Sequence, residues 1–177
     1  MSAARKFDRV AMDYYPTPPE VVDAIQPFLP MAETVLDPCC GVGEILARFH
    51  CAAIGIELDK VRADAAHRAG IEAHQGDALM IDWPDADLCV FNPPFTSILD
   101  FARKAIAWRK PRATVAMLGR LTFLESAERG PFHREHPADV FVLSRRPRFR
   151  GDTNGTDSVT AAWFVWGPGR GGRWQVL

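Results

Sequence analysis

The sequence of 177 residues predicts a doubly wound α/β domain with a mostly parallel, seven-stranded sheet that ends in an antiparallel hairpin. Two observations support this fold. Short apolar runs alternate with helical patterns between residues 34 and 118, an order typical of a parallel sheet covered on both faces. Two further runs follow at 140–143 and 159–166, and the glycine-containing turn 151–155 between them favours an antiparallel pair.

The length suits one domain. We expect a loosely held arm over residues 1–14, a single domain over 15–166 and a glycine-rich tail over 167–177. No apolar stretch reaches the ~20 residues of a membrane span, and the N-terminal residues lack a signal-peptide core. These observations predict a cytoplasmic location without membrane attachment.

The first helix is expected to begin at Thr17-Pro18-Pro19-Glu20. Thr17 would serve as the N-cap, proline would occupy the first turn, and Glu20 follows the cap by three residues. The helix should end by Pro30, since proline cannot continue a helix.

The remaining elements follow from the apolar patterns. Helices are expected from 43 to about 51, from a cap at Asp59 to about Gly70, and from about 97 to 109. A short polar stretch with Gly130-Pro131 and Pro137 should lead to the sixth strand. The seven strands are expected at 34–38, 52–57, 71–75, 87–92, 114–118, 140–143 and 159–166.

A glycine turn follows the first strand, in the run Asp37-Pro38-Cys39-Cys40-Gly41-Val42-Gly43-Glu44. Glycine at 41 and 43 allows a ligand or another backbone to approach where a Cβ would block it. The second strand ends in Glu57, twenty residues after Asp37, and an acid there is placed to accept hydrogen bonds from ribose hydroxyls. The pattern predicts a nucleoside cofactor.

The charges around this turn select the cofactor class. Asp37 and Glu44 flank the turn, and carboxylates there would repel a pyrophosphate at a helix N-terminus. The third small residue of a dinucleotide fingerprint is also replaced, by Leu46. A cationic cofactor without phosphate tolerates both features, and S-adenosylmethionine is such a cofactor.

The fourth strand ends in Asn92-Pro93-Pro94-Phe95. Proline fixes the backbone and removes a donor, so this turn presents a side-chain amide, a carbonyl oxygen and an aromatic ring in a rigid arrangement. Two acceptors and a flat ring suit a planar group that carries an amino nitrogen. The other interpretation is a proline-rich loop that only ends the strand.

These motifs together resemble the S-adenosylmethionine-dependent DNA adenine N6-methyltransferases, most closely the small phage-type ones. The resemblance implies a Rossmann-like methyltransferase fold, methyl transfer to the exocyclic N6 amine of adenine in DNA, and a bacterial or phage-infected host cell. It rests on Tyr15 to Pro19, Asp37 to Gly43, Glu57, Gly76-Asp77, Asn92 to Phe95 and the tail Asp157 to Trp166.

The resemblance also assigns roles. Asn92, Pro93, Pro94 and Phe95 form the catalytic motif. Asp77 would accept from the adenine amine of the cofactor, although it could equally serve a turn or a helix cap. The cofactor-binding set is Tyr15, Thr17, Pro18, Asp37, Pro38, Gly41, Gly43, Glu57, Leu58, Asp77, Ala78 and Asn92.

Charge is unevenly distributed along the chain. Residues 1–102 hold 7 Lys/Arg and 16 Asp/Glu, whereas residues 103–177 hold 14 and 6. In the basic half, Arg145, Arg146, Arg148 and Arg150 cluster around Phe149 and form a plausible contact surface for phosphates. A solvated strand end is an equally weighted interpretation of that cluster.

Cysteines and histidines predict no metal site. Cys39, Cys40, Cys51 and Cys89 lack Cys-x-x-Cys spacing, which favours buried reduced thiols, and the five histidines show no ligand spacing. Cys39 follows a proline, as the nucleophile of cytosine C5-methyltransferases does, but it lies in the cofactor turn and is interpreted as packing.

Three functions remain open. The first is DNA adenine methylation. The second is methylation of an RNA base or of protein glutamine, because the Asn-Pro-Pro-aromatic motif is shared by such enzymes. The third is a module that binds nucleic acid or a partner methyltransferase without turnover. With little chain beyond the core, target selection would come from the arm, the basic hairpin, a homodimer or a partner subunit.

Overall fold

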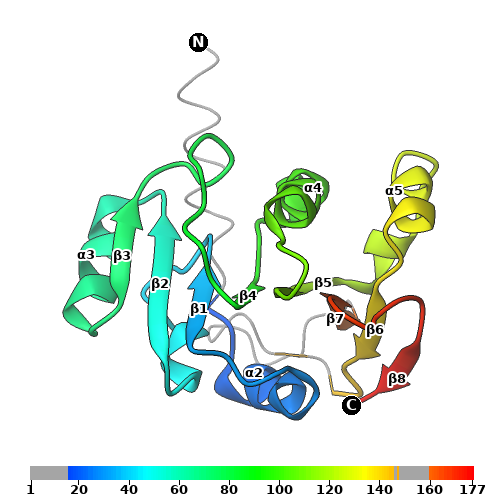
Figure 1. Ribbon diagram of the computed structural model, residues 1–177, viewed down its shortest axis with the longest axis horizontal. Coiled ribbons are helices and arrows are strands. Elements are labelled where there is room, and N and C mark those ends of the chain that lie inside the picture. The colour runs from blue at the N-terminus through cyan, green and yellow to red at the C-terminus, as the bar shows by residue number, and fades with distance from the viewer. Residues whose placement is uncertain (1–15, 146, 148–159) are drawn as a thin grey trace.

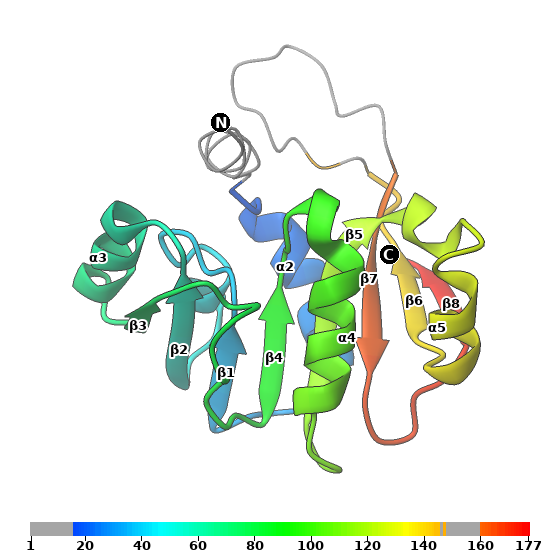
Figure 2. The same ribbon diagram turned by 90° about the horizontal axis from the view of Figure 1, so that it is seen from above.

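The computed structural model describes residues 16–145, 147 and 160–177, and these form an eight-stranded sheet in the order β3-β2-β1-β4-β5-β7-β6-β8 (Figures 1 and 2). The strands are β1 Thr34–Asp37, β2 Ala52–Glu57, β3 Glu72–Gln75, β4 Leu88–Phe91, β5 Thr114–Arg120, β6 Asp139–Val142, β7 Ala161–Trp166 and β8 Trp174–Val176.

The sheet is mostly parallel, as predicted. Strand β1 pairs in parallel with β2 and β4, and the parallel order continues to β3 on one side and β5 on the other. Strand β7 runs antiparallel to both β5 and β6, and its arrow points opposite to that of β4 in Figure 2. The doubly wound fold with antiparallel C-terminal strands is confirmed.

The number of strands is eight rather than the predicted seven. The extra strand, β8, pairs in parallel with β6 and lies within residues 167–177, which the sequence suggested to be a tail. Asp139 of β6 accepts hydrogen bonds from the backbone N–H groups of Gly171 and Arg173 and from the guanidinium groups of Arg170 and Arg173. These bonds tie the glycine-rich segment to the sheet, and hydrophobic pattern alone does not reveal them.

Helices cover both faces of the sheet, with α4 and α5 on one side and α2 on the other (Figure 1). The two hydrophobic cores follow this division: Val21, Val22 and Ile25 of α2 lie in one, together with Ala66 of α3, and Phe101 of α4 lies in the other. The helices are α2 Pro19–Ile25, α3 Lys60–Arg68, α4 Ile98–Trp108 and α5 Gly130–Glu135, with 3-10 turns η1 Gln26–Phe28, η2 Leu46–Arg48, η3 Phe95–Ser97 and η4 Leu121–Leu124.

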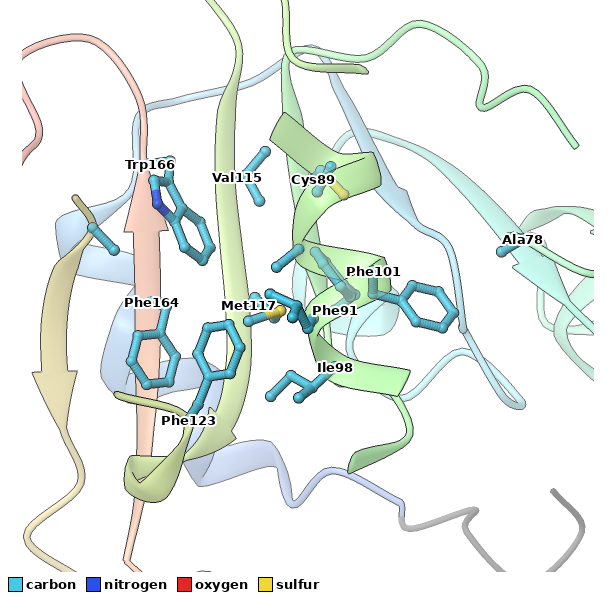
Figure 3. Close-up of a cluster of buried hydrophobic side chains, with 14 of the residues drawn as sticks. Ala78, Cys89, Phe91, Ile98, Phe101, Val115, Met117, Phe123, Phe164 and Trp166 are labelled. Carbon is cyan, nitrogen blue, oxygen red and sulfur yellow. The ribbon is translucent and has the colours of Figure 1, made fainter. Parts of the chain in front are cut away.

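Successive side chains of a strand point to opposite faces of the sheet and therefore contribute to both cores. In β5, Val115 and Met117 belong to the α4-side core, whereas Ala116 and Leu118 belong to the α2-side core. Figure 3 shows Met117 among aromatic rings from the neighbouring strands, including Phe91 and Phe164. Because every residue of β4 and β7 is buried, these central strands are apolar throughout, as expected of a sheet covered on both faces.

Two local predictions are wrong. The helix expected over 43–51 is reduced to the single turn η2, because Gly43 has a φ of 100° and Phe49 is already extended. The polar stretch expected around Gly130-Pro131 contains α5, whose first turn holds Pro131 and whose buried Phe132 joins the α4-side core. Proline is compatible with a first helical turn, so its presence did not argue against a helix.

Among the described residues, the helices are all too short or too polar to cross a membrane.

Candidate functional site

The candidate site lies at the carboxyl edge of the parallel strands. Asp37 ends β1, Glu57 ends β2, Asn92 follows β4, and Arg120 ends β5. Ligands of open α/β sheets bind at this edge, where loops from neighbouring strands diverge. The tertiary structure therefore gathers residues that are up to 83 positions apart in the chain.

The glycine loop after β1 has the backbone shape that only glycine adopts without strain. Gly41 and Gly43 have φ values of 59° and 100°. A Cβ on Gly43 would lie 2.1 Å from Cδ1 of Ile71, so a side chain is excluded on steric grounds as well. The N–H of Cys40 donates to the carbonyl of Ile56 at 3.0 Å and fixes the loop against β2.

Glu57 holds this loop from the end of β2. It is 5% exposed, and its Oε2 accepts from the N–H of Gly41 at 3.0 Å. Its Oε1 accepts from the N–H of Asp59 and from the guanidinium group of Arg62, at 2.8 and 2.9 Å. A carboxylate offers about four acceptor positions, so capacity for one ribose hydroxyl remains on Oε2.

Asp37 is buried beneath the same loop, at 1% exposure. Burial, together with the nearby carboxylates of Glu57 and Glu44, raises the pKa of its carboxyl group from 3.8 to about 8. The N–H of Cys39 opposes this shift by donating to Oδ1 at 2.9 Å. Three acids around one loop create a site that favours a cation and disfavours a phosphate. This electrostatic character fits S-adenosylmethionine.

Asn92 begins the turn after β4 and is held at two atoms. Its Nδ2 donates to Oγ1 of Thr17 at 3.1 Å, and its backbone carbonyl accepts from the thiol of Cys39 at 3.4 Å. The second contact joins the turn to the glycine loop, so the two sequence motifs form one site. Pro93 is buried, and the carbonyl of Pro94 accepts from the N–H of Ser97 as η3 begins.

Thr17 does not cap the first helix, which corrects the sequence prediction. The N-cap of α2 is Pro18, and no side chain caps that helix. The hydroxyl of Thr17, which is only 5% exposed, is instead engaged with Asn92. Asp59 behaves as predicted, since its Oδ1 accepts from the N–H of Arg62 at the start of α3.

The ring of Phe95 lies beneath a cation. The guanidinium carbon of Arg120 is 4.4 Å from the centre of this ring, a cation–π contact between the ends of β4 and β5. Sequence reasoning missed Arg120 and also missed Arg62. Arg120 is the last residue of β5, and Arg62 lies in the first turn of α3 after the Asp59 cap. Both could have been found by asking which charged residues lie at the carboxyl edge of the sheet.

The cysteines are thiols in this environment. Burial raises the pKa of Cys39, Cys40 and Cys89 above the ordinary value of 9.0, and the charge of Asp37 adds to the effect. A nucleophilic cysteine requires the opposite change in pKa. Cys39 is therefore a packing residue that also donates to Asn92.

Other predicted residues occupy the same edge. Leu58 is 36% exposed at the tip of β2, and Pro38 and Ala78 are buried. Asp77 follows β3, and its Oδ1 accepts from the N–H of Leu79 at 2.9 Å, which is the contact of a turn residue. Its role toward a cofactor stays a prediction.

The predicted basic cluster is described only in part. Arg145 is exposed beyond β6, and β6 runs in the same direction as β5, so this residue leaves the sheet from the edge that holds Asn92. Tyr15, Arg146, Arg148 and Arg150 lie outside the described residues, as do the turn 151–155 and the segment Asp157–Val159.

Comparison with known proteins places the chain among methyltransferases. A family model described as the uncharacterised methyltransferase family (DUF6094) matches residues 2–125, and no curated protein matches the chain. Three solved structures illustrate the shared fold at low identity.

The first is a putative class I S-adenosylmethionine-dependent methyltransferase from Listeria monocytogenes (13% identity, TM-score 0.68, 91% of this chain and 65% of that chain). The second is a type I restriction-modification methyltransferase subunit from Streptococcus thermophilus (16%, 0.68, 88% and 45%). The third is a dimethyladenosine transferase from Plasmodium falciparum (17%, 0.63, 86% and 62%).

The chain spans less than two thirds of the length of each of these three. Likeness at such identities establishes the fold, and the family match extends over well over half of the sequence. This chain therefore belongs to the uncharacterised methyltransferase family (DUF6094), and its cofactor is S-adenosylmethionine.

Proposed function

We propose that this protein transfers the methyl group of S-adenosylmethionine to the N6 amine of adenine in DNA. The observation that supports this most directly is the contact between Cys39 and Asn92. It places the Asn-Pro-Pro-Phe turn against the acid-lined glycine loop, so an amine held by Asn92 would lie beside the cofactor.

The cofactor would be held by the glycine loop, by Glu57 and by the residues around Asp37. When bound, it supplies a methyl group on a positively charged sulfur, which is already activated for displacement. The protein must therefore align the two reactants, and alignment alone lowers a barrier by up to roughly 7–11 kcal/mol.

Asn92 and Pro93 would act on the target amine. The lone pair of an adenine amine is delocalised into the ring, which makes the nitrogen a poor nucleophile. Acceptors at Oδ1 of Asn92 and at the carbonyl of Pro93 would hold its two hydrogens, favour a more tetrahedral nitrogen and stabilise the positive charge that develops there. No general base is needed to begin the reaction.

Phe95 would contact the target base, and Arg120 would contact the nucleic-acid backbone beside it. The ring of Phe95 offers a surface for stacking, which is worth roughly 1–3 kcal/mol per base. One face of that ring is covered by Arg120. A flipped-out adenine would stack on this ring in place of the guanidinium group, which could then contact a neighbouring phosphate.

The nucleic-acid assignment has two further supports. The C-terminal half of the sequence is basic, and Arg145 leaves the sheet at the edge of the site. The structures that share the fold include a modification subunit of a putative type I restriction enzyme and a dimethyladenosine transferase. By analogy with the restriction-enzyme subunit, a partner subunit or a second copy would supply target selection.

The test is transfer of labelled methyl from S-adenosylmethionine to four acceptors: duplex DNA, single-stranded DNA, structured RNA and peptides. Digestion of the nucleic acids to nucleosides and mass analysis should identify N6-methyladenosine in its deoxy form. Label in RNA or glutamine would instead support the alternative acceptors, and tight DNA binding without label would support the non-catalytic module.

The matched variant is Asn92→Ala. It should remain folded, as urea unfolding would show, yet lose transfer by at least about a hundredfold, the loss typical when a donor or acceptor aimed at a transition state is removed. Activity near that of the wild type in the folded variant would refute the role given to Asn92.

A further inference from the structure

The side chains of Thr17 and Asn92 are joined across 75 positions of sequence. Nδ2 of Asn92 lies 3.1 Å from Oγ1 of Thr17, and Thr17 is 5% exposed. A hydrogen bond buried to this degree is little weakened by competition with water.

The backbone around Thr17 is rigid. Pro16 precedes it and Pro18 follows it, and Pro18 has a φ of −58°. A residue before proline is restricted to extended conformations, so the backbone at Thr17 has little freedom, and the bond to Asn92 holds its hydroxyl. Helix α2 then anchors the segment, because Val21 and Ile25 are buried in the α2-side core.

The proposed chemistry requires the side-chain amide of Asn92 to keep one orientation. One end of a carboxamide accepts hydrogen bonds and the other donates, so only one orientation presents an acceptor to a target amine. With Nδ2 directed to Thr17, the end of the amide that can accept from a target amine is Oδ1. The carbonyl of the same residue is held by the thiol of Cys39, so backbone and side chain are both restrained.

We infer that Thr17 is a positioning residue that acts through Asn92, holding the amide so that its oxygen meets the target amine. This inference rests on the proposed function and deepens it. It differs from the cofactor-binding role that the family resemblance implies for Thr17, and the two roles predict different measurements.

The kinetic test compares Thr17→Val, which removes the hydroxyl and keeps the shape, with Thr17→Ser, which keeps the hydroxyl. Thr17→Val should lower kcat about tenfold and leave the Kd for S-adenosylmethionine, measured by calorimetry, within about twofold of the wild type. Thr17→Ser should restore kcat to within about threefold.

Thr114→Val is the control for placing valine at a buried threonine. Thr114 is 3% exposed and begins β5, at the edge of the sheet opposite to the site. It should leave kcat unchanged. A Kd for S-adenosylmethionine weakened tenfold in Thr17→Val with kcat preserved would overturn the inference in favour of cofactor binding, and wild-type kcat and Kd would overturn it outright.

A second readout does not depend on activity. The side-chain NH₂ signals of Asn92 can be assigned in NMR spectra by their loss in Asn92→Ala, and their hydrogen exchange measured without cofactor. Exchange should be at least about tenfold faster in Thr17→Val than in wild type. Equal exchange would overturn the inference even if no acceptor is found, which separates its failure from failure of the proposed function.

Discussion

Replacing Asp37 by asparagine should make the stability of the domain much less dependent on pH. Asp37 is 1% exposed and burial raises the pKa of its carboxyl group to about 8. An acid whose pKa is raised in the folded state stabilises the fold while it is protonated. That contribution is complete below the unfolded pKa of 3.8 and is lost as pH rises through about 8.

The size of the effect follows from the two pKa values. At about 1.36 kcal/mol per pH unit, the interval between 3.8 and about 8 corresponds to about 5–6 kcal/mol in the free energy of unfolding. Between pH 5 and pH 8, the wild type should lose about 3–4 kcal/mol relative to Asp37→Asn. Asparagine keeps an oxygen that can accept from the N–H of Cys39, so the loop geometry should persist.

The assay is urea unfolding of both proteins at pH 5, 6, 7 and 8 at constant ionic strength. All other titrating groups are common to the two proteins, so their difference reports Asp37 alone. If the difference in free energy of unfolding between the two proteins stays constant across this range, the pKa of Asp37 is not raised by burial and the reasoning is refuted. A companion measurement is the Kd for S-adenosylmethionine, whose positive charge should draw the proton from Asp37, so that binding to wild type strengthens with pH up to about 8.

Four further outcomes are expected. Gly43→Ala should lower stability by about 2–4 kcal/mol in urea unfolding, since it combines a φ of 100° with a Cβ 2.1 Å from a neighbouring atom, and retained stability would contradict the loop geometry. Glu57→Gln should cost about 1–3 kcal/mol in the same assay, because the buried carboxylate accepts from the N–H of Gly41 and pairs with the half-buried guanidinium group of Arg62. Asp139→Asn should cost about 2 kcal/mol above pH 4 and release the C-terminal strand to proteolysis. Burial raises the pKa of Asp139 but the bonds it accepts outweigh this and lower it to about 2, so its contribution is lost as pH falls from 3.8 through that value, and a cost that persists at pH 2 would argue against this origin. Arg120→Gln should change stability by less than about 1 kcal/mol. It should also weaken DNA binding and reduce the slope of log affinity against log salt concentration by about one phosphate contact. An unchanged slope would show that Arg120 contacts Phe95 but no phosphate.

The elements that the sequence predicted correctly are those with long apolar patterns or strong caps. Strands β1, β4 and β5 are fully or largely buried, and burial on both faces leaves a continuous apolar run that can be read directly. Helix α3 was found from its Asp59 cap, which is a local interaction.

The elements that it did not predict depend on contacts distant in sequence. Strand β8 has three exposed residues and exists because Asp139 and β6 hold it in place. Thr17 has the local sequence of an N-cap, but its hydroxyl meets Asn92, which lies 75 positions away in the sequence.

By itself, the sequence determined the fold class, the cofactor class and the two motifs, because strand periodicity, glycine geometry and acidic charge are encoded in neighbouring residues. The tertiary structure alone decided which atoms of those motifs meet. It joined Cys39 and Thr17 to Asn92 and placed Arg120 over Phe95. The physical reason is that parallel strand pairing brings chain segments far apart in sequence to one edge, and the partners found there depend on register rather than on local pattern.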